Sequence, residues 1–394
     1  MTGAPLAIHG GVPTRATLLP YGRHTVDDDD VEAVVAALRS GWLTTGPAVD
    51  AFESAFAEAV GARYAVAVAN GTAALHAAAF AAGIGPGDEV VTTPITFAAS
   101  ANCARYLGAT VVFADVRPDT LTLDPADVAR RITPRTRAVI AVDYAGQPAD
   151  LDELTALARR YGLTLIEDAA HALGATYRGR RIGAAAPLTT FSLHPVKHVT
   201  TGEGGVITTD DPALRDRLRM FRTHGITSEA GRRDGWFYEM VALGFNYRLS
   251  DIQCALGLSQ LRKLGGWLKR RRAIAAEYTE RLAPLDALAP LATLSDRESA
   301  WHLYVVRLRL DRLRGGRADI FRALRAENIG VNVHYIPVPW HPYYRELGYR
   351  RGGWPVAETG YEELLSLPLF PAMTDADVDD VVRAVTKVVD HFQR

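Results

Sequence analysis

The feature that most limits the possible folds of this sequence is a series of short apolar runs in its first half, most of them separated by stretches of helix length. The runs are rich in Val, Ile, Thr and Ala and cover residues 65–68, 89–92, 110–113, 138–142, 164–166, 189–193 and 206–209. Continuous apolar strands that alternate with helices are typical of a mostly parallel sheet covered on both faces. The sequence therefore predicts an α/β fold with a large, mostly parallel sheet.

The pattern changes after about residue 262. We expect two long basic helices at 250–264 and 266–282, a strand at 301–310, a helix at 318–328, a strand at 331–335 and a terminal helix at 375–392. Mixed helices and strands in this order indicate a smaller α+β unit. The prediction is a large domain over residues 1–262, which includes an N-terminal arm, and a small C-terminal domain over residues 263–394.

Composition excludes several classes of protein. The chain has 45 acidic and 44 basic residues, so it carries no charge excess for binding nucleic acid or an anionic membrane. Its two cysteines, Cys103 and Cys254, form neither a CxxC motif nor a metal-binding spacing. We therefore expect no disulfide framework and a reducing compartment, the cytoplasm.

Two uncharged stretches could be mistaken for membrane spans. Residues 64–87 are interrupted by Asn70-Gly71-Thr72, and residues 90–104 are too short and contain Pro94. The N-terminal residues MTGAPLAIHGG lack the basic and apolar regions of a signal peptide. We expect neither a membrane span nor a signal peptide.

Ligands of such sheets bind beyond the carboxyl ends of the strands, so the residues after each strand matter most. Asn70-Gly71-Thr72 follows one predicted strand and opens a helix predicted at 73–82. Glycine lets the backbone approach a ligand closely, and a helix N-terminus favours an anion. Any strand-to-helix turn benefits from glycine, however, so this turn does not identify a site by itself.

Asp168 and Lys197 are two charged residues in unusual positions, because both lie next to apolar runs. Asp168 follows a buried strand, where an acid costs free energy without a cationic partner, although it could simply cap a helix. Lys197 lies in a loop rich in glycine and threonine between two apolar runs. His194 and His198 are four residues apart, but Pro195 disfavours the helix that would align them on a metal ion. We expect no metal site.

Together these features are the parts that a pyridoxal phosphate enzyme needs. A lysine forms a Schiff base, an aspartate keeps the pyridine nitrogen protonated, and a helix N-terminus binds the phosphate. The chain order of Gly71, Asp168 and Lys197 fits this set. We therefore expect pyridoxal 5′-phosphate as the cofactor.

Longer motifs support the same interpretation. They are SGWLTTGPAVDAFE, VANGTAALHAA, PITFAASAN, AGQPADL, IEDAAHALGA, FSLHPVKHVTTGEGGVITT, GFNYRLSDIQCALGLSQL and HLYVV. With these, the sequence resembles the sugar aminotransferases of the DegT/DnrJ/StrS family over nearly its whole length, which implies the aspartate-aminotransferase-like fold (fold type I). EDAAHALGA and HPVKHVTTGEGG are similar to the UDP-4-amino-4,6-dideoxy-N-acetyl-β-L-altrosamine transaminases of pseudaminic acid biosynthesis.

The resemblance implies roles for the residues around the coenzyme ring. Lys197 would be the Schiff-base lysine and would move the proton, and Asp168 would pair with the pyridine nitrogen. His171 would lie beside the ring hydroxyl, at a position where many relatives have glutamine. Phe97 would stack on the ring, although it could also be a plain core residue.

The resemblance also implies a phosphate site and a dimer. Gly71, Thr72 and Ser192 would hold the phosphate. Asn246 would reach it from the partner subunit of a homodimer with shared active sites, although it could instead be an ordinary turn asparagine.

The implied activity is transfer of an amino group from L-glutamate to a nucleotide-linked 4-keto-6-deoxyhexose, in particular UDP-4-keto-6-deoxy-N-acetylhexosamine. Alternatives are a dTDP-keto-sugar or aminocyclitol aminotransferase of an antibiotic pathway, or a non-catalytic regulator with the same fold. Lysine at position 197, where related dehydratases have histidine, favours amino transfer.

Loops would select the sugar. Candidate substrate-binding residues there are Thr44, Gly46 and His334. Arg232 and Arg233 could meet the diphosphate or lie in a solvated loop.

Overall fold

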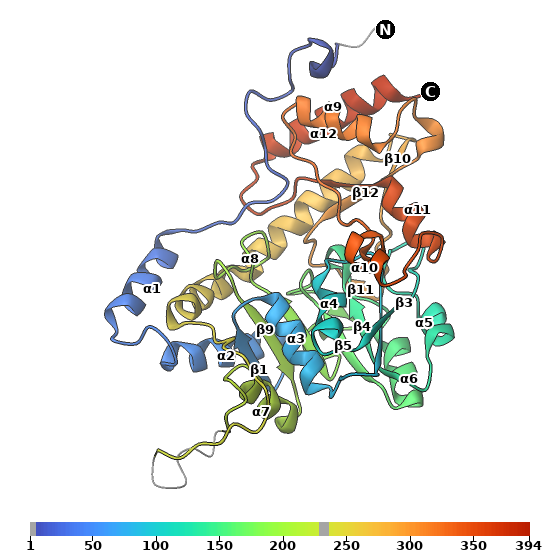
Figure 1. Cartoon of the computed structure of the whole chain (residues 1–394). Coiled ribbons are helices and arrows are strands. Elements are labelled where there is room, and N and C mark those ends of the chain that lie inside the picture. The colour runs from blue at the N-terminus through green and yellow to red at the C-terminus, as the bar shows by residue number, and fades with distance from the viewer. Residues whose placement is uncertain (1–4, 228–235) are drawn as a thin grey trace.

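Residues 5–227 and 236–394 are described by the structure, a computed structural model of the chain (Figure 1). Within them, a seven-stranded sheet has the strand order β1-β9-β8-β5-β4-β2-β3. Its strands are β1 (Tyr64–Val68), β2 (Glu89–Thr92), β3 (Thr110–Phe113), β4 (Thr136–Val142), β5 (Thr164–Asp168), β8 (Leu188–Ser192) and β9 (Gly205–Thr209). Strand β9 runs antiparallel to both neighbours, and the other neighbouring pairs are parallel. The predicted α/β fold with a mostly parallel sheet is confirmed.

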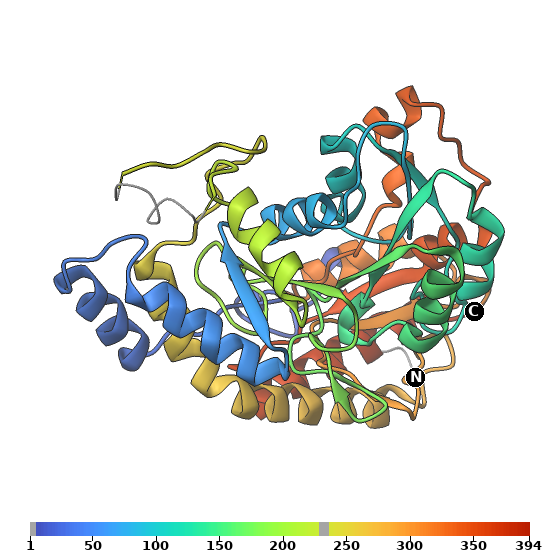
Figure 2. The same ribbon diagram turned by 90° about the horizontal axis from the view of Figure 1, so that it is seen from below.

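Helices cover both faces of this sheet (Figure 2). One face packs against α3 (Gly71–Ala81), α4 (Ala99–Tyr106) and α7 (Pro212–Phe221), and the other against α2 (Pro47–Val60), α5 (Pro125–Arg131), α6 (Leu151–Tyr161) and the first half of α8 (Asp251–Leu282). The helix α1 (Asp28–Arg39) packs against α8. Successive strand residues enter opposite cores, Ile140 on one face and Val139 on the other. Burial on both faces explains why the strands are apolar at nearly every position.

The C-terminal part has its own core, in the upper half of Figure 1. It contains an antiparallel sheet of β10 (Leu288–Pro290), β12 (Tyr304–Leu308) and β13 (Leu364–Leu367), packed against α9 (Arg317–Ala326), α12 (Asp375–Phe392) and the second half of α8. The remaining elements are α10 (Pro342–Glu346), α11 (Pro355–Glu363) and a small sheet of β6 (Thr176–Tyr177), β7 (Arg180–Arg181) and β11 (Arg297–Glu298). Helix α12 has the predicted bounds, since Thr374 caps it through the backbone N–H of Asp377.

Two predicted elements differ from the structure. The two helices expected at 250–264 and 266–282 are one helix, α8, which continues through Gly265 and Gly266. Packing of both helix halves outweighs the cost of about 1 kcal/mol per helical glycine. The strand expected at 331–335 is a single bridge between Asn332 and Ser366. Beyond this bridge the chain runs along a cavity, which residues 332–335 line.

The N-terminal arm and α8 join the two parts. Leu6 and Leu19 lie in the C-terminal core, and Arg15 forms an ion pair of 2.8 Å with Asp377. The expected domain boundary between residues 262 and 263 falls inside α8. The arm thus packs on the C-terminal part, although the prediction grouped it with the large domain.

The part of the chain covered by residues 5–227 and 236–394 has no helix that combines the length and apolarity needed to cross a bilayer. Arg232 and Arg233, which were considered for the diphosphate, lie outside the described residues.

Candidate active site

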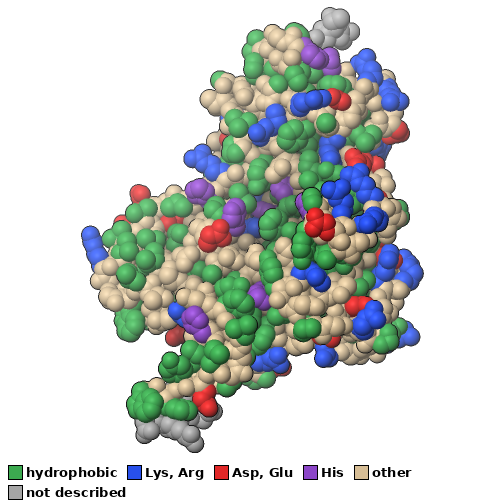
Figure 3. Space-filling model, in the orientation of Figure 1, with side chains coloured by type: hydrophobic (Ala, Val, Ile, Leu, Met, Phe, Trp, Pro, Cys, Tyr) green, Lys and Arg blue, Asp and Glu red, His purple; other side chains and the backbone are tan. Residues whose placement is uncertain are grey.

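A cavity of about 550 Å³ lies where the carboxyl ends of the central strands meet residues 332–335. The face drawn in Figure 3 is hollowed between the two parts of the molecule, and histidine side chains gather around the hollow. The predicted site residues that line the cavity are Gly71, Thr72, Phe97, Asp168, His171, Ser192, Lys197 and His334. The fold therefore brings together side chains that are far apart in the sequence.

The first turn of α3 forms one wall of the cavity. Asn70 caps the helix by accepting a hydrogen bond of 2.8 Å from the backbone N–H of Ala73. Gly71 lies so close to Ser192 that an added Cβ would be 2.9 Å from the Cβ of that serine. Glycine is therefore required where α3 meets the end of β8. The N–H groups of a first helical turn and two hydroxyls, those of Thr72 and Ser192, form a typical anion site.

Asp168 is the last residue of β5 and is 4% exposed. Its carboxylate accepts hydrogen bonds of 2.6 Å from Ser100 Oγ and 3.2 Å from the backbone N–H of Ala170. Ser100 is itself held by Thr96, whose Oγ1 is 2.7 Å away. Burial raises the pKa of Asp168, while Ser100, Ala170 and the charge of Lys197 oppose this rise. The carboxylate is thus fixed in a buried position, where it would bind a cationic N–H strongly.

Lys197 lies in the turn between β8 and β9, and its backbone N–H donates to the carbonyl of His194 at 2.9 Å. Burial lowers the pKa of its amine to about 8, and the charge of Asp168 opposes this shift. A part of the population is therefore neutral near pH 7, as a nucleophile or a base must be. His194 is exposed and His198 is buried. The described residues contain no group of three or more His, Cys, Asp or Glu placed to hold a metal ion.

His171 is buried, and its Nε2 lies 3.0 Å from the hydroxyl of Tyr335. The ring of His302 lines the cavity beside it, with a centroid distance of 4.3 Å. His334 bonds Ser366 Oγ through Nδ1 at 2.8 Å. Burial, with the charge of Lys197 as a smaller cause, lowers the pKa of His334 to about 4, so this imidazole is neutral.

Several residues of this site had no predicted role. Ser100 and His302 stand inside the quoted motifs PITFAASAN and HLYVV, but neither was assigned a role. The polar residues in these motifs were the available signal. Nothing in the local pattern around Tyr335 pointed to a contact with His171, because 164 residues separate the two.

Of the remaining predicted site residues, one lines the cavity and three lie outside it. Phe97 is 61% exposed and its ring centre is 6.1 Å from that of Tyr335, so it is not a core residue. Thr44 pairs with Ser250, the backbone N–H of Gly46 donates to Asp251 at 2.8 Å, and neither lines the cavity. Asn246 is exposed and pairs with Thr223 outside the cavity. The structure of one chain therefore does not bring Thr44, Gly46 or Asn246 into the site.

Comparisons with known proteins agree with this geometry. The model of the DegT/DnrJ/EryC1/StrS aminotransferase family matches residues 24–386. The spore coat polysaccharide biosynthesis protein SpsC of Bacillus subtilis (strain 168) is 44% identical over 386 residues, which cover 96% of this chain and 99% of that protein.

Solved structures are similar over almost the whole chain. Helicobacter pylori PseC, an aminotransferase involved in the biosynthesis of pseudoaminic acid, is 30% identical with a TM-score of 0.90, and the match covers 95% of this chain and 100% of that one. Spr1654 of Streptococcus pneumoniae in its PLP form is 30% identical with a TM-score of 0.89, and the match covers 95% of this chain and 99% of that one.

Proposed function

The chain belongs to the DegT/DnrJ/EryC1/StrS aminotransferase family, and we propose that it transfers an amino group from L-glutamate to the keto group of a nucleotide-linked 4-keto-6-deoxyhexose. It is a pyridoxal phosphate-dependent sugar aminotransferase. The observation that carries the proposal is the meeting of Lys197, Asp168 and the first turn of α3 in one cavity. A partly neutral lysine at this position is suited to chemistry, whereas a purely structural role would not need it.

The residues present fit pyridoxal phosphate. Gly71, Thr72 and Ser192 would hold the phosphate at the start of α3. Asp168 would accept the N–H of the pyridine ring, and Lys197 would bind the coenzyme covalently. When bound, the coenzyme supplies an electron sink for the carbanion that forms on proton removal.

The chain's own part in the reaction is to move protons. Nζ of Lys197, when free and neutral, removes the proton from the α-carbon of the donor amino acid. Its lowered pKa of about 8 leaves a usable neutral fraction at pH 7. The buried carboxylate of Asp168 keeps the ring nitrogen protonated, and the neutral imidazoles of His171 and His334 add no charge to the cavity.

The half-reaction with glutamate tests the activity. The purified enzyme with pyridoxal phosphate should change from the pyridoxal to the pyridoxamine absorbance on addition of L-glutamate and release one equivalent of 2-oxoglutarate. Lys197→Ala is the matched control and should bind the coenzyme without this change. A wild-type protein that binds the coenzyme but shows no change with glutamate or another amino donor would instead be a regulator.

For the sugar we favour UDP-4-keto-6-deoxy-N-acetylhexosamine, as in pseudaminic acid biosynthesis. The similarity to PseC and the motifs around His171 and Lys197 support this choice. His334 lines the cavity and is a candidate sugar contact, with Thr44 and Gly46 as further candidates from loops. Amination of a panel of UDP- and dTDP-linked keto sugars, with the product stereochemistry determined by NMR, separates this substrate from a dTDP-keto sugar or an aminocyclitol.

We also propose a cytoplasmic homodimer in which each site uses residues of both chains. Asn246 stays outside its own cavity, and the preceding segment exposes the large apolar side chains of Trp236, Met240 and Leu243. Apolar side chains exposed in this way favour a protein interface. Two buried free cysteines, Cys103 and Cys254, are compatible with a reducing compartment.

Subunit mixing tests the shared site. Lys197→Ala and Asn246→Asp should each be nearly inactive, because the second places a carboxylate beside the phosphate. Random exchange makes about half of the dimers mixed, each with one intact site, so activity should recover to about a quarter of wild type. If exchange is verified and no activity returns, Asn246 does not serve the partner's site.

A further inference from the structure

Strand β13 carries one hydroxyl in an otherwise apolar sequence. Its residues are Leu364, Leu365, Ser366 and Leu367, and Ser366 is 1% exposed. A buried hydroxyl costs free energy unless it forms a hydrogen bond. Within residues 5–227 and 236–394, the side-chain hydrogen bond of Ser366 is the one of 2.8 Å between its Oγ and Nδ1 of His334. Alanine would pack in this strand without that cost, so the hydroxyl indicates a role in holding His334.

His334 is held from both parts of the molecule. The backbone of Ser366 pairs with that of Asn332, with N–H to carbonyl distances of 2.8 and 3.2 Å, and this pair places His334 two residues further along the chain. The carbonyl of His334 accepts a hydrogen bond from the hydroxyl of Tyr144, which follows β4 of the large sheet. The imidazole of His334 is 6% exposed and lines the cavity in a fixed position.

The side chain of Asn332 fixes where the proton of His334 lies. Its Oδ1 accepts a hydrogen bond of 2.8 Å from the backbone N–H of Val333, which leaves Nδ2 for the contact of 3.4 Å with Nε2 of His334. An amide nitrogen only donates, so Nε2 is an acceptor and carries no proton. Burial, with the charge of Lys197 as a smaller cause, lowers the pKa of His334 to about 4. The imidazole is therefore neutral near pH 7, and its one proton lies on Nδ1 and is donated to Ser366.

The two nitrogens of this imidazole have different surroundings. Nδ1 meets Ser366, which does not line the cavity, whereas Nε2 meets Asn332, which does. Nε2 is therefore the nitrogen on the cavity side. Its contact of 3.4 Å with Asn332 is long for a hydrogen bond, so an O–H or N–H of a ligand can share or replace it. A carboxylate or phosphate oxygen would instead meet a lone pair.

We propose that Ser366 is a positioning residue that makes His334 an acceptor for a hydroxyl or amide N–H of the sugar substrate. Ser366 takes the Nδ1 proton, and the lone pair of Nε2 faces the cavity. A keto sugar carries such donors in its hydroxyl groups, and an N-acetyl group adds an amide N–H. L-Glutamate presents carboxylates, which the lone pair disfavours. The inference rests on the proposed function in that the ligand facing His334 is taken to be the keto sugar.

Kinetics of Ser366→Ala test the role in substrate binding. With the keto sugar that has the highest kcat/KM in the panel, KM should rise about tenfold, as for the loss of one hydrogen bond, while kcat stays within about twofold. The half-reaction with L-glutamate should keep its rate and its dependence on glutamate concentration. An unchanged KM for the keto sugar overturns the proposal, and so does a loss confined to the glutamate half-reaction.

Thr208→Val is the matched control. Thr208 is a fully buried hydroxyl on β9 that donates to the carbonyl of Gly183 at 2.7 Å and does not line the cavity. Its loss removes a buried hydrogen bond without touching His334. The variant should therefore keep the KM of the wild type for the keto sugar. A tenfold rise in this control as well would show that the effect of Ser366→Ala is a general loss of packing, and would overturn the proposal.

The proton on His334 can be observed without turnover. In ¹⁵N NMR of the protein with labelled histidine, the signals of His334 are those missing from His334→Phe, and they should show a proton on Nδ1. In Ser366→Ala the Nδ1 signal should shift, because its proton has lost the acceptor, and in Thr208→Val it should not. An Nε2–H imidazole in the wild type, or an unchanged Nδ1 signal in Ser366→Ala, overturns the proposal. Because no substrate is added, this result stands apart from the glutamate half-reaction, whose failure would contradict the proposed function.

Discussion

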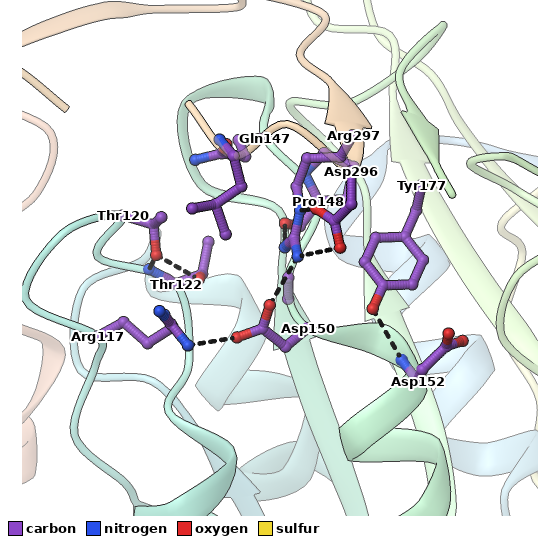
Figure 4. Close-up of polar contacts among 12 residues, drawn as sticks. Arg117, Thr120, Thr122, Gln147, Pro148, Asp150, Asp152, Tyr177, Asp296 and Arg297 are labelled. Carbon is purple, nitrogen blue, oxygen red and sulfur yellow. Dashed lines mark hydrogen bonds and ion pairs between the residues drawn. The ribbon is translucent and has the colours of Figure 1, made fainter. Parts of the chain in front are cut away.

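Two buried aspartates, Asp150 and Asp168, lie in very different surroundings. Asp150 is 5% exposed, and its carboxylate accepts from Arg297 at 2.8 Å and from Arg117 at 3.2 Å (Figure 4). Arg297 also donates to the carbonyl of Pro148 at 2.8 Å and lies over the ring of Tyr177, 4.8 Å from its centre. The charges of this cluster are therefore paired within the protein.

Asp168 is equally buried but accepts from a hydroxyl and a backbone N–H, and no ion pair within residues 5–227 and 236–394 includes it. Its neighbours in the cavity wall include imidazole nitrogens without partners. The difference teaches how to distinguish the two kinds of buried charge. A charge that is paired inside the protein holds the fold together, whereas one left facing a cavity is available to a ligand.

Substitution of Asp168, the aspartate that faces the cavity, should have the largest effect on activity. Asp168→Asn should lose activity by several orders of magnitude, because a neutral amide cannot keep the pyridine nitrogen protonated. Its free energy of unfolding should not fall, since burial already disfavours the charged carboxylate. Steady-state kinetics and urea unfolding check both parts. A variant with near-native kcat would show that Asp168 does not have this role.

Substitution in the paired cluster around Asp150 should instead lower the stability and leave the activity unchanged. Arg297→Met removes one of the two arginines that pair with the carboxylate of Asp150, so we expect a loss of about 1.5–3 kcal/mol in the free energy of unfolding. The value of kcat should stay near that of the wild type, because Arg297 does not line the cavity. Urea unfolding, followed by two independent spectroscopic signals, measures the free energy of unfolding. A large fall in kcat with unchanged stability would contradict the distinction.

Glu167 sharpens the comparison, because it precedes Asp168 but, among the described residues, forms no ion pair and does not line the cavity. Its carboxylate accepts from Thr189 Oγ1 at 2.8 Å, and Asp143 is a second buried carboxyl with which it interacts. Burial is the main cause that raises the pKa of Glu167 from 4.5 to about 7. The folded state therefore keeps a proton between these pH values that the unfolded state has lost.

The direction in which stability changes with pH follows from that difference in bound protons. The contribution of Glu167 to stability is fully present below pH 4.5 and is lost as the pH rises to about 7. Glu167→Gln cannot lose a proton, so it should reduce this fall, while Asp143, whose pKa is also raised by burial, keeps its own share. Relative to wild type it should gain at most about 3.5 kcal/mol between the two limits, at about 1.4 kcal/mol per pKa unit. Equal pH dependence of urea unfolding in both proteins would contradict the raised pKa.

Much of the fold could be predicted from local pattern. Strands β2 and β3 and helix α12 have the predicted bounds, because apolar runs and a capping threonine act over a few residues. The single helix α8 and the bridge at Asn332 were not predictable in this way. Packing of distant elements decides whether a helix passes through two glycines and whether residues 332–335 pair with a sheet edge or line a cavity.

The sequence by itself determined which chemical groups the site contains, since Lys197, Asp168 and Gly71 lie within four residues after the ends of predicted strands. That rule works because the carboxyl ends of parallel strands meet at one edge of the sheet. Tertiary structure alone decided their environment. The lowered pKa of the Lys197 amine, the paired Asp150 and the contact of His171 with Tyr335 depend on burial and on contacts between residues more than a hundred positions apart. Solvation and hydrogen bonding depend on which residues are close in space, and the sequence alone does not specify those residues.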